Sequence, residues 1–261
     1  MKREFEEWIQ KIKILDGQQD FLVIYKPEGL AFYEDNTQVD LLKIIRFMEQ
    51  EKLLPEGERI FPVHRLDKIT SGILLFARGR KAANFLGNSF RFQRIQKIYL
   101  ALSYKKPKKK QGVVIGEMVK DRNSKWRLTF SMENPAITLF KSFPLITEDA
   151  KYFRIFLLKP VTGKTHQIRV AMKSLGSPVI GDPLYTRPSL ARLEDRAYLH
   201  AYGIRFEYKE KIYEYIQPPS TGGHFLYQDF RNFIKEIGNP FLQNWKYKIP
   251  YTTSLKKIHK N

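Results

Sequence analysis

The chain has 261 residues, of which 43% are hydrophobic and 14% aromatic, enough for one large domain or two small ones. Its 46 Lys and Arg outnumber 27 Asp and Glu, and the formal charge of +19 predicts a polyanionic partner, nucleic acid first and anionic membrane second. The lack of cysteine excludes disulfides, iron–sulfur clusters and thiolate zinc sites. The sequence shows neither a signal peptide nor an apolar run long enough to cross a bilayer, so we expect a cytoplasmic protein.

The first half of the chain predicts strands that alternate with helices. The apolar run FLVIY at 21–25 is followed by turn formers, which indicates a strand. Thr37 and Asp40 have capping-box spacing ahead of apolar residues at i, i+3, i+4 and i+7, which predicts an amphipathic helix over 41–48. Similar patterns predict a strand at 73–77, a helix at 82–90 and a strand at 95–104.

A lysine-rich segment, KKPKKKQG at 105–112, interrupts this pattern. Its lysines repel one another and cannot pack, so we expect an exposed loop, either a solvated turn or a phosphate contact. The charge of the whole chain favours the phosphate contact. Beyond it the patterns predict a strand at 152–160, a helix at 168–175, a hairpin at 198–216 that turns at Lys209 and Glu210, a helix at 230–237 and a basic tail from Trp245.

Strands joined partly by hairpins and partly by helices predict an α+β fold with a mixed, largely antiparallel sheet and peripheral helices. No internal repeat and no Pro- or Gly-rich linker divides the sequence, so one continuous domain is favoured over two. We expect this domain to span 21–219, between a lead segment at 1–20 and a helical and basic extension at 220–261.

Three polar clusters are similar to known catalytic motifs, but each lacks a required feature. TGKT at 162–165 is similar to the end of a Walker phosphate loop, but Leu158 stands where that loop needs a glycine. HRLD at 64–67 is similar to a kinase catalytic loop, but Gly72 stands where the metal-binding asparagine would follow. The five histidines never have HExxH spacing, so we expect no metal site.

Asp67 and Arg169 remain as charged groups on separate segments, and by themselves they could form an ordinary ion pair. Their surroundings are more specific. The motifs HRLDKITSG, QKIYLAL, TGKTHQIR, GDPLY and YLHA follow one another in the order and spacing of the RluA family of RNA pseudouridine synthases, which the chain resembles over 21–219. The resemblance implies the catalytic fold of that family and an isomerase that flips a uridine out and moves its sugar from N1 to C5, with no cofactor.

Matching positions imply the catalytic residues. Asp67 matches the aspartate that acts at ribose C1′, as a nucleophile or as a stabiliser of the broken glycosidic bond. Arg169 matches the arginine that pairs with this aspartate and fixes its orientation. Tyr99 matches the tyrosine that packs on the flipped base, and whether it is a stacking platform or also a base toward a ribose proton stays open.

The RNA contacts are expected around the same motifs. Arg65 matches a residue that resembles an intercalating plug, filling the gap that the flipped uridine leaves. Leu74 and Ile168 are expected to line the uracil pocket, although ordinary core packing explains both equally well. Further RNA contacts are expected from His64, Thr165, His166, Gln167, Lys105, Lys106, Lys108, Lys109 and Lys110.

Many relatives in the resembled family carry a small N-terminal RNA-binding domain, for which the residues at 1–20 leave no room. Substrate selection is therefore expected to rest on the core, the lysine-rich loop and the C-terminal extension. We expect a monomer that acts on a structured RNA, a stem-loop of ribosomal RNA or tRNA. The alternative is a non-catalytic RNA-binding protein or RNA chaperone on the same fold, but a buried acid among phosphate contacts favours the enzyme.

Overall fold

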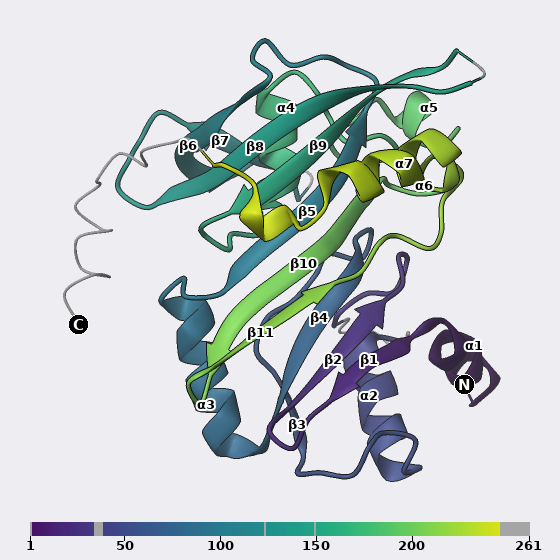
Figure 1. Cartoon of the computed structure of the whole chain (residues 1–261), viewed down its shortest axis with the longest axis vertical. Helices are drawn as coiled ribbons and strands as arrows, with labels where there is room; N and C mark the ends of the chain where they lie inside the picture. The colour runs from purple at the N-terminus through teal and green to yellow at the C-terminus, as the bar shows by residue number, and fades with distance from the viewer. Residues whose placement is uncertain (1, 34–38, 123, 149, 246–261) are drawn as a thin grey trace.

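The computed structural model describes residues 2–33, 39–122, 124–148 and 150–245. Within these residues eleven strands form one continuous sheet, with the order β1-β2-β4-β10-β5-β9-β8-β6-β7 and with β11 on β10 and β3 on β4. Only β4 and β10 pair in parallel among the described strands, over Ser71 and Gly72 opposite His200 and Ala201. The α+β class and the mixed, largely antiparallel sheet are thereby confirmed (Figure 1).

The strands are β1 (Lys13–Gly17), β2 (Phe21–Lys26), β3 (Ile60–Pro62), β4 (Ser71–Arg78), β5 (Gln96–Ser103), β6 (Gln111–Lys120), β7 (Trp126–Thr129), β8 (Pro135–Ile146), β9 (Tyr152–Pro160), β10 (Leu199–Tyr208) and β11 (Lys211–Ile216). The helices are α1 (Lys2–Lys11), α2 (Leu41–Gln50), α3 (Gly79–Arg91), α4 (Gln167–Ser174), α5 (Pro188–Ala191), α6 (Gly223–Leu226), α7 (Gln228–Ile237) and the short 3₁₀ helix η1 (Pro240–Leu242).

The start of α2 differs from the predicted capping box. Asp40 is itself the residue that caps the helix, because its carboxylate accepts a hydrogen bond from the Lys43 backbone N–H at 2.8 Å. The expected role of Thr37 falls outside the described residues. The predicted hairpin turn is confirmed: Lys209 and Glu210 have φ of 49° and 62°, the positive values that a tight two-residue turn between twisted strands requires.

The lead segment extends the sheet at its N-terminal edge. β1 pairs antiparallel with β2, and α1 packs Phe5, Trp8 and Ile9 against the apolar cluster that contains α2. The C-terminal helices also pack on the sheet, where Phe225 and Phe230 join a buried cluster with side chains of β5 and β9. Both segments therefore share apolar cores with the strands of the predicted central domain.

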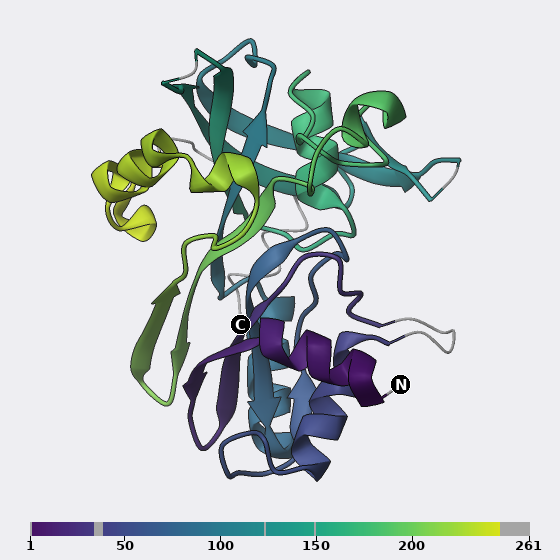
Figure 2. The same ribbon diagram turned by 90° about the vertical axis from the view of Figure 1, so that its right-hand side faces the viewer.

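Helices cover both faces of the sheet. Figure 2 shows α7 on one side of the strands β5, β9 and β8 and α4 on the other. On the α4 side, Ile168 and Met172 pack against Phe156 and Leu158 of β9. Tyr99 of β5 packs partly buried against this cluster and also against the cluster around α2, so it lies where the two parts of the core meet.

A close backbone approach fixes the start of β4. Gly72 has φ of 115°, and a Cβ there would lie 2.2 Å from the Ala201 carbonyl oxygen of β10, so only glycine fits. This explains the small-residue step between HRLD and the apolar strand. The loop that carries Asp67 is consequently held against the centre of the sheet. Among the described residues, no helix is both long and apolar enough to cross a lipid bilayer.

Candidate active site

Three loops from distant parts of the sequence border a cleft of about 590 Å³. They are the β3–β4 loop, the C-terminal turn of α3 with the start of β5, and the β9–α4 loop. The residues of the cleft that bear on its chemistry are Arg65, Asp67, Tyr99, Thr165, His166 and Arg169. The volume falls in the range of small-molecule sites and would accept one flipped nucleoside.

A buried guanidinium joins two carboxylates at the base of this cleft. Arg169 Nη1 donates to Asp67 Oδ2 at 3.1 Å, across 102 residues of sequence. Arg169 also makes a bidentate pair with Asp182, with Nε to Oδ2 at 2.7 Å and Nη2 to Oδ1 at 2.9 Å. Asp182 is fully buried, whereas a quarter of the Asp67 side chain is exposed. Of the two carboxylates, Asp67 is the one that a ligand in the cleft can reach.

Asp182 was missed by sequence reasoning, and it fixes the orientation of Arg169. Its Oδ1 also accepts the backbone N–H groups of Leu184 and Tyr185, so it is held by the chain as well as by the arginine. Burial by itself would lower the pKa of Arg169, but the two carboxylates outweigh burial and the pKa lies above its usual value. The guanidinium therefore stays charged at every physiological pH.

Hydrogen bonds hold the backbone of the loop that carries Asp67. Its Lys68 carbonyl accepts the Gly29 N–H at 2.8 Å and approaches the Lys26 ammonium at 3.5 Å. Lys26 is completely buried, and burial lowers its pKa to about 7 even though Glu28 and Asp67 oppose the shift. The Thr70 N–H closes the loop by donating to the Asp67 carbonyl at 3.0 Å. These contacts hold the backbone of the loop that carries Asp67, and Arg169 holds its carboxylate.

Tyr99 lines the cleft from the middle of β5, beside Asp67. Burial, with the negative charge of Asp67 as a second cause, raises the pKa of its hydroxyl above the ordinary tyrosine value. The hydroxyl is thus protonated at neutral pH. This favours a stacking platform that donates a hydrogen bond over a base that removes a proton.

Arg65 and Thr165 meet at the mouth of the cleft. Arg65 is exposed, and its Nη2 donates to Thr165 Oγ1 at 2.7 Å. His166 follows with a left-handed φ of 57° directly before α4, and its Nδ1 lies 3.1 Å from the Tyr185 hydroxyl. Burial, with Arg169 as the next cause, lowers the pKa of His166, so its imidazole is neutral at pH 7. The structure brings these predicted RNA contacts together at one opening, and their contact with RNA stays a prediction.

Two predicted RNA contacts are instead occupied within the fold. His64 Nε2 accepts the Leu75 N–H at 2.9 Å, and burial, followed by Lys97, lowers its pKa to about 3. A neutral imidazole with that nitrogen bound offers no positive charge to a phosphate. The contact of His64 with RNA stays a prediction. Gln167 is 5% exposed, its amide donates to Ile137 and Thr138, and its oxygen accepts from Thr162 and Lys164. Its side-chain amide is thus engaged within the fold, and its contact with RNA stays a prediction.

The two predicted walls of the uracil pocket have different positions. Ile168 borders the cleft while it packs on the β9 cluster. Leu74 is fully buried in the cluster with Leu22 and Ile24 of β2 and the apolar face of α2, and it is not among the residues that border the cleft. Of the two roles considered for Leu74, its position therefore favours core packing, and a contact with uracil stays a prediction.

We expect Leu74→Ala to lower the free energy of unfolding by about 2–5 kcal/mol, because it leaves a cavity at a fully buried site. Chemical denaturation measures this loss. Ligand binding by the folded fraction should be unchanged. A matched Leu193→Ala variant, at a leucine that is 79% exposed, should be nearly neutral. Equal stability of the two variants would contradict the assignment of Leu74 to the core.

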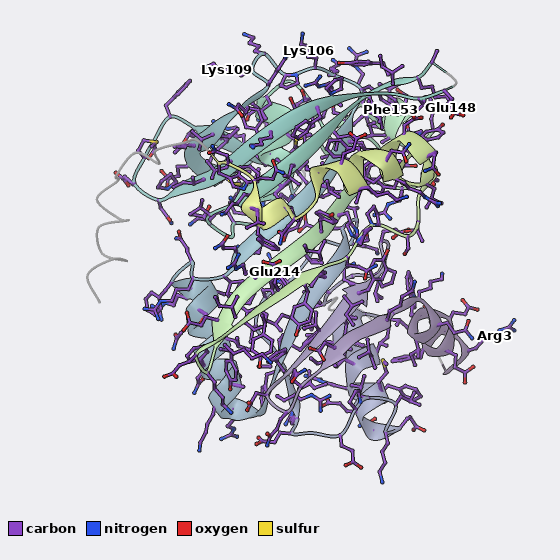
Figure 3. The ribbon with its side chains drawn as sticks, in the orientation of Figure 1. Arg3, Lys106, Lys109, Glu148, Phe153 and Glu214 are labelled. Atoms are coloured by element: carbon purple, nitrogen blue, oxygen red, sulfur yellow. The ribbon has the colours of Figure 1, made fainter. Side chains whose placement is uncertain are left out.

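The lysine-rich loop lies at the end of β5 that is remote from the cleft. Lys105, Lys106 and the lysines at 108–110 are exposed, as expected, and Figure 3 shows Lys106 and Lys109 pointing outward from the end of the molecule. Tyr99, in the middle of β5, borders the cleft, and Lys105 lies beyond the end of the strand, six residues or roughly 20 Å further along the chain. None of these lysines borders the cleft. Contact with RNA farther from the cleft stays a prediction.

Other cations, which sequence reasoning did not single out, do border the cleft. Lys97 projects into it beside Tyr99, and its Nζ would lie 3.9 Å from a Cβ at Gly163. Burial lowers the pKa of Lys97 to about 8. Lys164 lies on the β9–α4 loop and donates to Asn134 at 2.7 Å. The alternation of side chains along β5 was the available signal, because Lys97 must share the face of Tyr99.

Comparisons with known proteins agree with this geometry. A family model described as RNA pseudouridylate synthase matches residues 20–174. A Haemophilus influenzae protein described as an uncharacterized RNA pseudouridine synthase is 41% identical over 233 residues, which cover 89% of this chain and 99% of that protein. The dual-specificity RNA pseudouridine synthase RluA of Pasteurella multocida is 31% identical over 76% of this chain and 87% of its own length.

Two further similarities bear on target and fold. The ribosomal large subunit pseudouridine synthase C of Rickettsia bellii is 33% identical over 71% of this chain and 60% of its own length. The solved structure of human RNA Pseudouridylate Synthase Domain Containing 1 superposes with a TM-score of 0.67 at 26% identity, over 80% of this chain and 83% of that one. The expected catalytic fold is confirmed, and an enzyme is favoured over a non-catalytic binder.

Proposed function

Because this chain belongs to the RNA pseudouridylate synthase family, and is thus an isomerase that acts on RNA, we propose that Asp67 is the carboxylate of its active site. The single observation that carries the proposal is the Asp67–Arg169–Asp182 arrangement. One buried cation lies between two carboxylates, and only Asp67 also faces the cleft. Arg169 holds the acid in place while leaving its second oxygen free of that guanidinium.

In the proposed reaction, a uridine leaves its stack and enters the cleft. The C1′–N1 bond breaks while Asp67 bonds to C1′ or stabilises the positive charge that develops there. The uracil, still bound, turns so that C5 faces C1′. The C5–C1′ bond then forms and the carboxylate is released. The C5 proton leaves to solvent, and N1, which no longer bonds to the sugar, takes up a proton from solvent. The base loses one proton at C5 and gains one at N1, so its composition is unchanged and the reaction is an isomerisation.

The surroundings of Asp67 support separate roles in holding the uridine. The Tyr99 ring is placed to stack on uracil, and its protonated hydroxyl can donate a hydrogen bond. Ile168 supplies an apolar wall. Arg65 and Thr165 at the mouth are placed to fill the gap that the flipped uridine leaves in the stack.

We propose a stem-loop of ribosomal RNA or tRNA as the target. The Rickettsia relative is named for the large ribosomal subunit, which supports ribosomal RNA, and the Pasteurella relative is named as a dual-specificity RNA enzyme, which supports more than one class of RNA. The test is carbodiimide mapping of pseudouridine in both RNA classes from a strain that lacks the gene, before and after incubation with the protein. A new pseudouridine in either class is expected. Conversion in neither class, with a positive control enzyme active on the same RNA, would contradict this choice of target.

Because the pKa of Lys97 is lowered to about 8, we expect RNA binding to depend on pH. Lys97 is a cation below its pKa of about 8 and neutral above it, so a phosphate contact is lost as the pH rises. We expect RNA affinity to fall between about pH 7 and 9, where an ordinary lysine stays charged. Lys97→Arg should keep its charge and bind independently of pH over this range. A wild-type affinity as flat as that of Lys97→Arg would contradict the contact.

A further inference from the structure

Most partly or fully buried arginines of the fold are neutralised within it. Arg169 pairs with Asp67 and Asp182, Arg196 with Glu28 at 2.9 Å, and Arg205 with Glu214 at 3.3 Å. Arginines of this kind hold the fold together and offer no free charge to a ligand. An arginine that a partner binds should instead be exposed, held in place and without a carboxylate.

The turn at the C-terminal end of α3, residues 91–94, carries two arginines of this second kind. They are Arg91 and Arg94, and the aromatic Phe92 lies between them in the sequence. Both are exposed, and in the described part of the chain neither forms an ion pair with a carboxylate. Their guanidinium carbons lie 5.8 and 5.7 Å from the centre of the Phe92 ring, which is itself 39% exposed. The ring therefore holds both cations at the surface, and part of the Phe92 side chain remains exposed between them.

This turn is continuous with the cleft. Arg91 and Gln93 border the cleft together with Asp67 and Tyr99. The preceding Phe90 stacks on His64 with ring centres 4.4 Å apart and planes at 21°, and the Lys97 ammonium lies 6.0 Å from the Phe90 ring. His64 is in turn bound to the Leu75 backbone. The residues between the turn at 91–94 and the loop that carries Asp67 are thus held by packing and by a hydrogen bond. We therefore expect the turn to keep its position at the edge of the cleft.

We propose that the α3 turn, residues 91–94, is the docking site for the single-stranded RNA segment on one side of the flipped uridine. Arg91 and Arg94 hold backbone phosphates, and Phe92 stacks on an unpaired base. Guanidinium groups and an exposed ring in alternation fit single-stranded nucleic acid, since phosphates and bases also alternate. The inference rests on the proposed function for the position of the uridine, and it assigns to this turn the RNA contacts that the lysine-rich loop does not make in the cleft.

The test compares two variants that each lose two positive charges. Arg91→Gln/Arg94→Gln is expected to weaken RNA binding on the order of tenfold and to reduce its salt slope by about 1 to 2 units. Arg231→Gln/Lys235→Gln removes two exposed charges from α7, on the far face of the sheet, and should leave the salt slope nearly unchanged. This control measures how much the loss of any two positive charges weakens RNA binding through the overall electrostatic attraction of a chain with charge +19.

A third variant separates stacking from charge. Phe92→Leu keeps an apolar side chain of similar size, and it is expected to weaken binding roughly 5- to 100-fold with the salt slope unchanged. Equal slopes for the two charge variants would overturn the docking site, as would a Phe92→Leu variant that binds like the wild type. All binding is also measured in Asp67→Asn protein. An inactive wild-type chain that still binds through Arg91 and Arg94 would refute the proposed function and leave the docking site intact.

Discussion

Asp67→Asn should lower the rate of uridine conversion on the order of 10⁴-fold or more while RNA affinity stays close to that of the wild type. The amide has the size of the carboxylate but cannot act as an anionic nucleophile or stabilise positive charge at C1′. Its oxygen can still accept the hydrogen bond from Arg169, which lies 3.1 Å from Asp67 Oδ2. The fold and the basic cleft are therefore retained.

Single-turnover conversion of the target RNA measures this effect, with filter binding and thermal unfolding on the same samples. Asp20→Asn is the matched control, because it removes one carboxylate from a surface pair with Lys209. That variant should convert RNA at the wild-type rate. Substantial conversion by Asp67→Asn would exclude Asp67 as the catalytic carboxylate.

Arg169→Gln should lower the free energy of unfolding by about 3–5 kcal/mol, because Asp182 is fully buried and loses its bidentate partner. Adding Asp182→Asn should restore much of this stability, because the buried charge is removed and the two amides can bond to each other. Turnover should stay low in the double variant, since Asp67 still lacks the cation that orients it.

Denaturant unfolding and single-turnover rates of the single and double variants separate the two roles of Arg169. An Arg169→Gln variant as stable as the wild type would contradict the energetic role of the buried pair. A double variant with wild-type turnover would show that the reaction does not need the guanidinium at Asp67.

The strands and helices that sequence reasoning predicted are those with the strongest apolar patterns. The run at 21–25 and the strand at 152–160 each lie between two paired strands, and nearly all of their residues are buried, so continuous apolar residues are required. The helices α2 and α3 bury one stripe each, which gives the 3.6-residue period. Composition and period identify such elements without any tertiary information.

The strands β6, β7 and β8 were missed because they lie toward the exposed end of the sheet. Many residues of β6 are only partly buried, and the strand is interrupted by Gly112 and Gly116. Pro135 and Pro144 weaken the strand pattern of β8. Their strand conformation depends on pairing with β9 and with each other, which a local pattern does not contain.

Within the site, sequence reasoning predicted the meeting of Asp67 and Arg169 from the resemblance, but it did not predict what holds Arg169. Asp182 follows a glycine and precedes a proline, a pattern typical of an ordinary turn, and only the folded chain shows that its carboxylate is buried against the guanidinium. The neutral state of His64 is equally a consequence of burial. Both depend on contacts between segments far apart in sequence.

The release of tritium from C5 tests the central claim most directly, because the proposed reaction replaces the C5–H bond of one uridine with a C5–C1′ bond. The wild-type protein is incubated with C5-tritiated ribosomal RNA and tRNA from a strain that lacks the gene. We expect tritium to enter water in stoichiometric amount with the pseudouridine formed, and Asp67→Asn to release none above background. No release by the wild type from either RNA, although both bind, would contradict the proposed chemistry at Asp67.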